Sequence, residues 1–480
     1  MMRIAFLFLA TGLLPALALE EKEMTFTGLG WVQYGLVAHS TDTVNLNYNG
    51  NSVQSTGAQI SLLARISDRL QGRAGLGAIE NQAMAGGITS GGRVPTSVTP
   101  YIAEANFTYS FWDMEGSQLK LTGGLFSFNY NPDIRNLGLY LLRGPVYPGI
   151  VVSGFETKDV LPIANMLGFN LRHRMGGFQQ DLLINSENEL HPFFDISPAY
   201  IAGYEFGKAF RIGAGVNFYH LIPIDSKLTS PPLDSSLLAD RKEKSENEVK
   251  HPYDRGMIYV DSTEGKRDTT VMSFQGTKLM ANFTLDPKAW FGDGGRLGPE
   301  DLKLYGEVAV IGLNTEKAYK ALYGELRERM PMMVGFNLPM FKLLDHLSLE
   351  MEWYAAPFRD DFSRYQVNRG SFESPIPVSN AFANRNPQTI VIDTATGQTR
   401  VVVAGTNIPF EQANLEKNLE KDNFKWSLHG SKVIQQHFRI SFQLANDHFR
   451  PGGTPAQPSW EAILSTPEDW YWMSKVSCYF

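Results

Sequence analysis

The chain has 480 residues, of which 43% are apolar, 12% are aromatic and only 19% are charged. This composition excludes a chain that is disordered throughout, and the formal net charge of −7 argues against a nucleic-acid partner. A single cysteine, Cys478, excludes an internal disulfide and a thiolate metal cluster, and no window past residue 18 is apolar enough for a membrane-spanning helix.

The first 18 residues have the layout of a secretory signal peptide. Arg3 is followed by an apolar run from Ile4 to Leu14, and small residues precede the expected cleavage after Ala18. The alternative is an N-terminal membrane anchor, for which the apolar run is short. The sequence therefore predicts an exported protein, with residues 19–480 forming a single domain.

The remaining sequence alternates apolar residues with polar or small ones, which is typical of β-strands that have two different faces. In the segment 101–111, Tyr101, Phe107 and Phe111 share one face, whereas Glu104 and Asn106 share the other. The alternation predicts an all-β chain of about sixteen strands (14–18). The predicted strands cover residues 25–38, 58–66, 70–79, 101–111, 117–128, 165–174, 178–185, 199–207, 210–218, 271–285, 301–312, 330–340, 346–356, 423–431, 438–444 and 469–480.

The connections between these segments alternate in length. Every second connection is a tight turn, with 286–300 as the one longer exception, and the others are long, above all 129–164, 225–268 and 359–422. A barrel in an outer membrane has this arrangement, with short periplasmic turns and long external loops. Closure into a barrel also pairs every backbone group within the protein, as a lipid environment requires. We therefore expect a transmembrane up-and-down antiparallel β-barrel.

The last predicted strand supports the same fold. It places Trp470, Trp472, Val476 and Cys478 on one face together with the terminal Phe480. A final strand that ends in an aromatic residue resembles the C-terminal signature of bacterial outer-membrane barrels, which their assembly machinery reads. Aromatic residues near strand ends also fit interfacial girdles; these are Tyr101, Phe111, Trp112, Trp353, Phe424, Trp426, Trp470 and Trp472.

The chain thus resembles a porin-like outer-membrane β-barrel of Gram-negative bacteria over its whole mature length. The resemblance is architectural and points to no particular porin family. It implies a location in the bacterial outer membrane, with membrane lipid and the barrel-assembly machinery as partners. It also implies a homotrimer, which is the usual assembly of such barrels.

The polar face of each predicted strand would line a water-filled lumen. The basic pore-lining candidates are Arg65, Arg73, Lys120, Arg172, Arg174, Arg211, Lys278, Lys303, Lys425, Arg439 and Lys475, and the acidic candidates are Glu104, Glu205, Glu307, Glu350 and Glu352. This excess of basic residues predicts a weak preference for anions. The alternative is that basic and acidic side chains pair across neighbouring strands and set no selectivity.

Three of the long connections carry further signals. Segment 129–164 is too apolar for a solvated loop, so it could fold inward and hold Asp133, Arg135 and Arg143 at a constriction; alternatively, it packs over the barrel mouth or against a partner subunit. The mixed charges of 225–268 predict a solvated, mobile loop. Within 359–422, the β-branched runs 389–393 and 399–404 predict an external hairpin.

No pattern in the sequence indicates an enzyme. The nine histidines lack metal-ligand spacing, and there is no nucleophile elbow or phosphate-binding loop. We therefore expect no catalytic residues, cofactor or metal. The predicted function is a porin-like channel for passive or selective diffusion of small hydrophilic solutes. The first alternative is a closed barrel that acts as a surface adhesin, receptor or structural anchor through its external loops, and the second is a membrane-embedded enzyme.

Overall fold

A computed structural model describes most of the barrel and parts of its connections. It covers residues 23–39, 50, 52–84, 97–142, 164–186, 194–219, 221–222, 224, 256–261, 268–273, 276–291, 295–313, 326–353, 388–392, 399–403, 424–446 and 468–480. The expected signal peptide, residues 1–18, and Arg143 lie outside these ranges.

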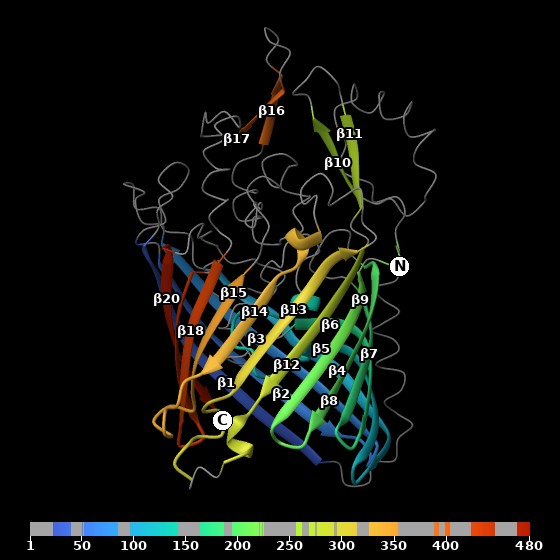
Figure 1. Cartoon of the computed structure of the whole chain (residues 1–480), viewed down its shortest axis with the longest axis vertical. Helices are drawn as coiled ribbons and strands as arrows, with labels where there is room; N and C mark the ends of the chain where they lie inside the picture. Colours follow the sequence, from blue (N-terminus) through green and yellow to red (C-terminus); the bar gives the residue numbers. More distant parts are fainter. Residues whose placement is uncertain are drawn as a thin grey trace.

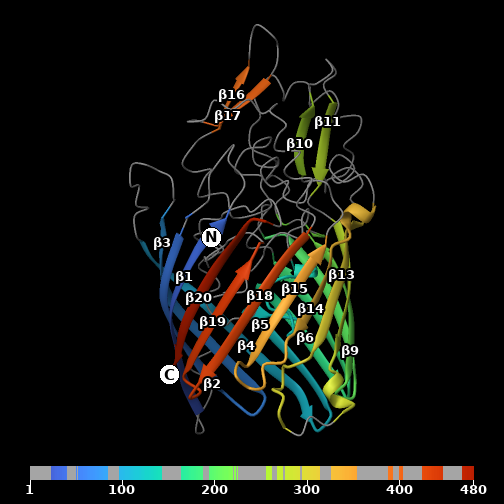
Figure 2. The same cartoon turned by 60° about the vertical axis from the view of Figure 1, so that its left-hand side comes forward.

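Sixteen strands form one closed antiparallel barrel (Figures 1 and 2). Each strand pairs with the next one in the barrel, and the last pairs with the first, so that Lys475 lies opposite Gln33. This confirms the predicted fold class and strand number. The barrel strands are β1 (Glu23–His39), β2 (Ser52–Arg65), β3 (Leu70–Met84), β4 (Ser97–Met114), β5 (Ser117–Phe128), β6 (Ala164–Met175), β7 (Phe178–Ser186), β8 (Ile196–Phe206), β9 (Phe210–Tyr219), β12 (Gly276–Leu285), β13 (Leu304–Leu313), β14 (Met332–Asn337), β15 (His346–Trp353), β18 (Phe424–Ile434), β19 (Phe438–Ala445) and β20 (Trp470–Tyr479).

The turns at one end of the barrel are short. Residues 115–116 join β4 to β5 and residues 176–177 join β6 to β7, and Gly116 and Gly176 adopt the positive φ that such tight turns require. The same end carries two larger turns, 286–303 and 338–345, which we call the large turns. The strand ends that flank the long connections lie at the opposite end of the barrel, as the sequence predicted (Figure 1).

Two hairpins lie outside the barrel sheet, beyond its long-loop end in Figure 1. Strands β16 (Gln388–Ile392) and β17 (Thr399–Val403) form the hairpin predicted within 359–422. Strands β10 (Gly256–Asp261) and β11 (Asp268–Ser273) form a second one. The sequence did not indicate this hairpin: β10 lies within the segment predicted as a solvated loop, and the predicted barrel strand 271–285 included residues 271–273 of β11, whereas the barrel strand begins at Gly276.

Helical structure is confined to three short 3-10 turns, η1 (Tyr140–Leu142), η2 (Pro287–Ala289) and η3 (Leu326–Arg329), in the ranges given above. Among those residues, no helix has the length and apolar character needed to cross a membrane.

The two faces of the barrel differ in chemistry. Leu76, Ile184 and Val476 are exposed on the outside, whereas Gln33 and Ser441 are buried on the inside. A barrel with apolar residues outside and polar residues inside is the inverse of a soluble barrel. The arrangement follows from the period-two alternation, because successive side chains of a strand point to opposite faces.

A β-bulge between β3 and β4 changes this alternation locally. Gly75 pairs with Glu104 and Leu76 pairs with Ile102, so Ala103 is the extra residue in β4. Ile102 therefore faces outward and Tyr101 faces inward, where its hydroxyl donates to Gln59 at 3.3 Å. The prediction that Tyr101 belongs to an outer aromatic girdle was wrong for this reason.

Candidate functional site

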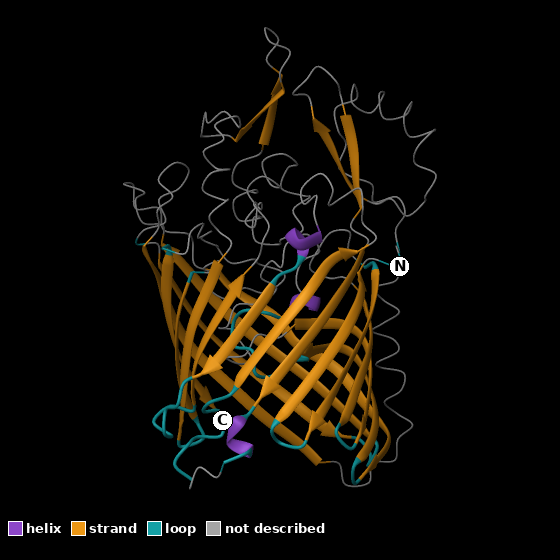
Figure 3. Cartoon of the chain, in the orientation of Figure 1, coloured by secondary structure: helices purple, strands orange, loops and turns teal. Residues whose placement is uncertain are grey.

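A segment of the β5–β6 connection, residues 129–142, lies inside the barrel (Figure 3). We call it the inner loop. Ile134, Leu137, Tyr140 and Leu141 are buried, and the loop contacts side chains on the inner faces of β9, β12, β13 and β15. Of the two arrangements left open by the sequence, this part of the loop adopts the inward one.

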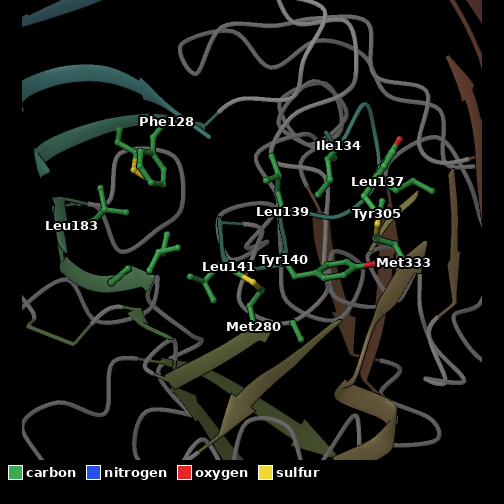
Figure 4. Packing of buried hydrophobic residues seen from close by; sticks show 14 of the residues in the cluster. Phe128, Ile134, Leu137, Leu139, Tyr140, Leu141, Leu183, Met280, Tyr305 and Met333 are labelled. Carbon is green, nitrogen blue, oxygen red and sulfur yellow. The ribbon is translucent and has the colours of Figure 1, made fainter. Parts of the chain in front are cut away.

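Apolar packing holds the inner loop against one side of the wall. Leu139 and Leu141 belong to a buried cluster with Leu183, Met280 and Met333, which point inward from β7, β12 and β14 (Figure 4). The wall is locally apolar here. This packing explains why the segment is too apolar for a solvated loop.

Glu350 of β15 anchors the backbone of the loop. Its carboxylate accepts hydrogen bonds from the backbone N–H groups of Arg135, Asn136 and Leu137 at 2.6, 2.8 and 2.8 Å. The Tyr305 hydroxyl donates a fourth at 2.8 Å. Glu350 is fully buried, and four donors to one carboxylate satisfy it without a cationic partner.

Two further acidic candidates hold Tyr140. Glu307 accepts hydrogen bonds from the Tyr140 N–H at 2.8 Å and from the Tyr130 hydroxyl at 2.6 Å. The Tyr140 hydroxyl donates to Glu352 at 2.9 Å. Glu307, Glu350 and Glu352 were expected to meet water in a lumen, but they are buried and bind the inner loop.

A network of charged side chains connects the inner loop to β9 and to the large turn 286–303. Asp133 lies 2.8 Å from Arg211 and 3.3 Å from Lys303, and it accepts a hydrogen bond from Thr284 at 2.7 Å. Arg135 and Lys303 each lie 2.8 Å from Glu300. Burial would raise the pKa of Asp133, but the positive charges of Lys303 and Arg211 outweigh it and hold this pKa below its usual value. The sequence did not point to Glu300, because it lies in a turn.

Most basic candidates near the short-turn end pair with acidic residues. Arg65 lies 3.3 Å from Glu23, Lys120 lies 2.7 Å from Asp113, Arg172 lies 2.7 Å from Asp181, and Arg174 lies 3.5 Å from Glu205. The sequence-based charge count omitted three of these acids. Glu23 and Asp113 lie just beyond the predicted strand ends, and Asp181 lies in a strand that alternates poorly. The positive excess on the inner face is therefore smaller than the count indicated.

Arg73 differs from these pairs. It shares the inner face with Leu63 and Asn106, its register partners on β2 and β4. Its side chain is exposed and forms no hydrogen bond or ion pair with any residue placed by the structure. Glu104 also faces inward, opposite Gly75.

The arc from β15 through β20 to β1 carries buried polar side chains. Lys425 and Lys475 are buried there, and the Lys475 ammonium lies 5.5 Å from the centre of the Trp31 ring. Arg439, on the same face, lies 5.5 Å from the Tyr479 ring. On β12, Lys278 is likewise buried, with its ammonium 5.3 Å from the Tyr219 ring.

Two histidines stack in the same arc. His346 and His429 lie with ring centres 5.0 Å apart and share a 2.9 Å nitrogen–nitrogen contact. Sequence reasoning missed this pair, because it joins strands 83 residues apart. Within the described ranges, no group of three or more His, Cys, Asp or Glu side chains could hold a metal ion.

Comparisons with known proteins identify no family for this chain. No family model matches the chain, and no curated protein matches it. Among solved structures, Salmonella typhi OmpF in complex with daunomycin is similar at 10% identity, over 95% of this chain and 97% of that chain, with a TM-score of 0.40. A mutant porin of Rh. blastica is similar at 7% identity, over 95% of this chain and all of that chain, with a TM-score of 0.37. The barrel is established by the strand pairing of the chain itself.

Proposed function

We propose that this protein is an outer-membrane channel of the porin kind, through which small hydrophilic solutes diffuse. The observation that carries the proposal is the inverted barrel, which closes sixteen strands with apolar side chains outside and charged side chains inside. Only a lipid environment favours that outer face, and closure satisfies the backbone there. Barrels of this strand number are wide enough for an aqueous channel.

The proposed topology follows from the turns. The short-turn end faces the periplasm and the long connections face outward. Residues 1–18 direct export, and the last strand together with the following Phe480 engages the assembly machinery. Membrane lipid surrounds the barrel, and three copies assemble side by side.

The inner loop is the proposed constriction. Asp133 and Arg135 lie buried on it, and Asp133 pairs with Arg211 and Lys303, so the loop would place charges of both signs beside the proposed path. Arg143, eight residues further along the chain than Arg135, is proposed to border the same path. The loop is fixed by hydrogen bonds to three buried glutamates, which favours a channel with one stable width.

The proposed ion selectivity is a weak preference for anions. Cross-strand pairs cancel most basic charges near the short-turn end, and Arg73 contributes a positive charge without such a partner. A fixed positive charge in a narrow aqueous path lowers the barrier for anions and raises it for cations.

Single-channel recording of the refolded mature chain in a planar bilayer, with a salt gradient, tests this proposal. We expect stable conducting steps and a reversal potential on the anion-selective side of zero. A correctly folded barrel that never conducts would overturn the channel. It would favour the alternative in which a closed barrel presents its external loops as an adhesin, receptor or anchor.

A further inference from the structure

The two large turns expose a group of bulky apolar side chains. Trp290 and Phe291 on the first turn are 66% and 50% exposed, and Phe341 and Leu343 on the second are 65% and 72% exposed. We call these four residues the apolar foot. Other turns at this end, such as Glu115-Gly116 and Gly176-Gly177, consist of polar residues and glycine. Bulky apolar side chains that are exposed on turns, beyond the strand ends, indicate a contact surface.

The two large turns form one unit. Asp301, a buried residue of the first turn, accepts hydrogen bonds from the backbone N–H groups of Met340 and Phe341 in the second, each at 3.1 Å. The backbone of Leu302 donates to Asn337 at 3.0 Å, and Asn337 donates to Lys303 at 2.9 Å. The apolar foot is therefore held in place rather than carried on two independent loops.

The backbone of the second large turn is strained at Phe341 and Lys342. Phe341 and Lys342 have φ values of 51° and 68°, in the left-handed region that side chains other than glycine rarely adopt. Such residues cost about 1–3 kcal/mol each and persist where the surroundings hold them. Here the bonds to Asp301 hold the turn, and the Phe341 side chain is left exposed. Packing of Phe341 into a buried core cannot explain the strain, because this side chain is exposed.

We propose that the apolar foot inserts into the phospholipid head-group region at the periplasmic surface of the membrane. The outer apolar face of the barrel continues to the apolar foot. Leu285 and Leu304 are paired at the ends of β12 and β13, and both lie on the same outer face as the exposed Leu279. Figure 2 places η2, in yellow, at the edge of the short-turn end below β9 and β13. Exposed Arg296 and Lys342 lie in the same turns, and aromatic, leucine and basic side chains together are the composition of interfacial segments.

This inference rests on the proposed membrane topology, and its test separates the two. Leu343→Cys and, as a matched control, Asp68→Cys of a short polar turn are made in a Cys478→Ser background and labelled with a polarity-sensitive fluorophore. The full chains are refolded into phosphatidylcholine vesicles with and without lipids brominated near the head group. We expect a blue-shifted spectrum and several-fold stronger quenching at position 343 than at position 68.

Equal quenching and a water-like spectrum at both positions would overturn the proposal. That result would favour a periplasmic protein as the partner that binds the apolar foot. Conductance of the same preparations reports separately whether a channel is present. If labelling at position 343 prevents refolding, the native tryptophan signal gives a second test. Quenching by brominated lipid should fall when Trp290→Ser is compared with the unchanged chain, and no fall would overturn the proposal.

Discussion

Glu350 and Glu205 both lie on the inner face of the barrel, but their surroundings differ. Glu350 is fully buried and accepts four hydrogen bonds, three of them from the backbone of the inner loop. Glu205 is about half exposed and faces Arg174 at 3.5 Å. The same residue type therefore fixes structure on the loop-bearing wall and adjusts the local field near the short-turn end. The position of a glutamate on the inner face therefore does not by itself show whether it anchors the inner loop or contributes to the electric field of the lumen.

The largest expected effect comes from Glu350→Gln. The amide keeps the size of the side chain, but it has one acceptor oxygen and places N–H groups against N–H donors. Because buried hydrogen bonds to a charged group contribute about 1.5–3 kcal/mol each, we expect attachment of the inner loop to weaken by about 3 kcal/mol. Single-channel recordings should show larger and noisier conductance.

Glu205→Gln is the matched control for that substitution, because its ion pair is long and solvent-exposed. Its conductance and noise should stay close to those of the unchanged protein. If Glu350→Gln gave equally quiet steps of unchanged size, the carboxylate would have no role in fixing the loop.

Asp133→Asn should have the next largest effect. It removes the negative charge that faces Arg211 and Lys303, and these partly buried pairs contribute about 1 kcal/mol each. Reversal potentials should move toward greater anion preference. Adding Arg211→Gln should return selectivity toward the starting value, and a double variant as anion-selective as Asp133→Asn alone would contradict the assignment.

Acidic pH should act on the same residue. The pKa of Asp133 is lowered in the folded protein, so the stabilisation from its ionised form is complete above its ordinary pKa of about 3.9. That stabilisation is lost as pH falls through the lower folded value. The difference in conductance between the unchanged chain and Asp133→Asn should stay constant from neutral pH to about pH 5 and disappear only in stronger acid. A change centred near neutral pH would exclude Asp133 as its cause.

The smallest effect is expected for Arg73→Ser. Because this side chain is exposed and has no partner among the residues placed by the structure, its loss should change stability by less than about 0.5 kcal/mol. Anion preference should decrease slightly at low salt and not at 1 M salt, where the screening length is about 3 Å. Lys208→Ser, which removes a positive charge from a short turn, should leave selectivity unchanged.

The barrel itself was predictable because alternation and turn chemistry are local. The segment 117–128 was expected as a strand and is β5 with the same ends. The two classes of connection followed from the spacing of such segments. The bulge at Ala103 was not predictable, because it depends on the register between β3 and β4 rather than on the pattern within β4.

The site was less predictable than the fold. Its apolar loop and its residues Asp133 and Arg135 stood out in the sequence, since their segment suits neither a strand nor a solvated loop. Their partners did not, because Glu350 reaches backbone N–H groups more than 200 residues away in the chain. Backbone donors carry no sequence signal, so a carboxylate that anchors a loop looks the same as one that faces water.

The pairing of β20 with β1 has a consequence for how the molecule forms. Met473 meets Gly35 across that seam, so the final ladder joins the two most distant parts of the barrel sequence. Until it forms, both terminal strands present unpaired N–H and C=O groups, and each such group costs several kcal/mol in hydrocarbon. An incomplete cylinder is therefore penalised along its whole seam, and assembly in lipid should behave as one slow, all-or-none event. The inner loop, enclosed by the finished cylinder, would be confined in the same event.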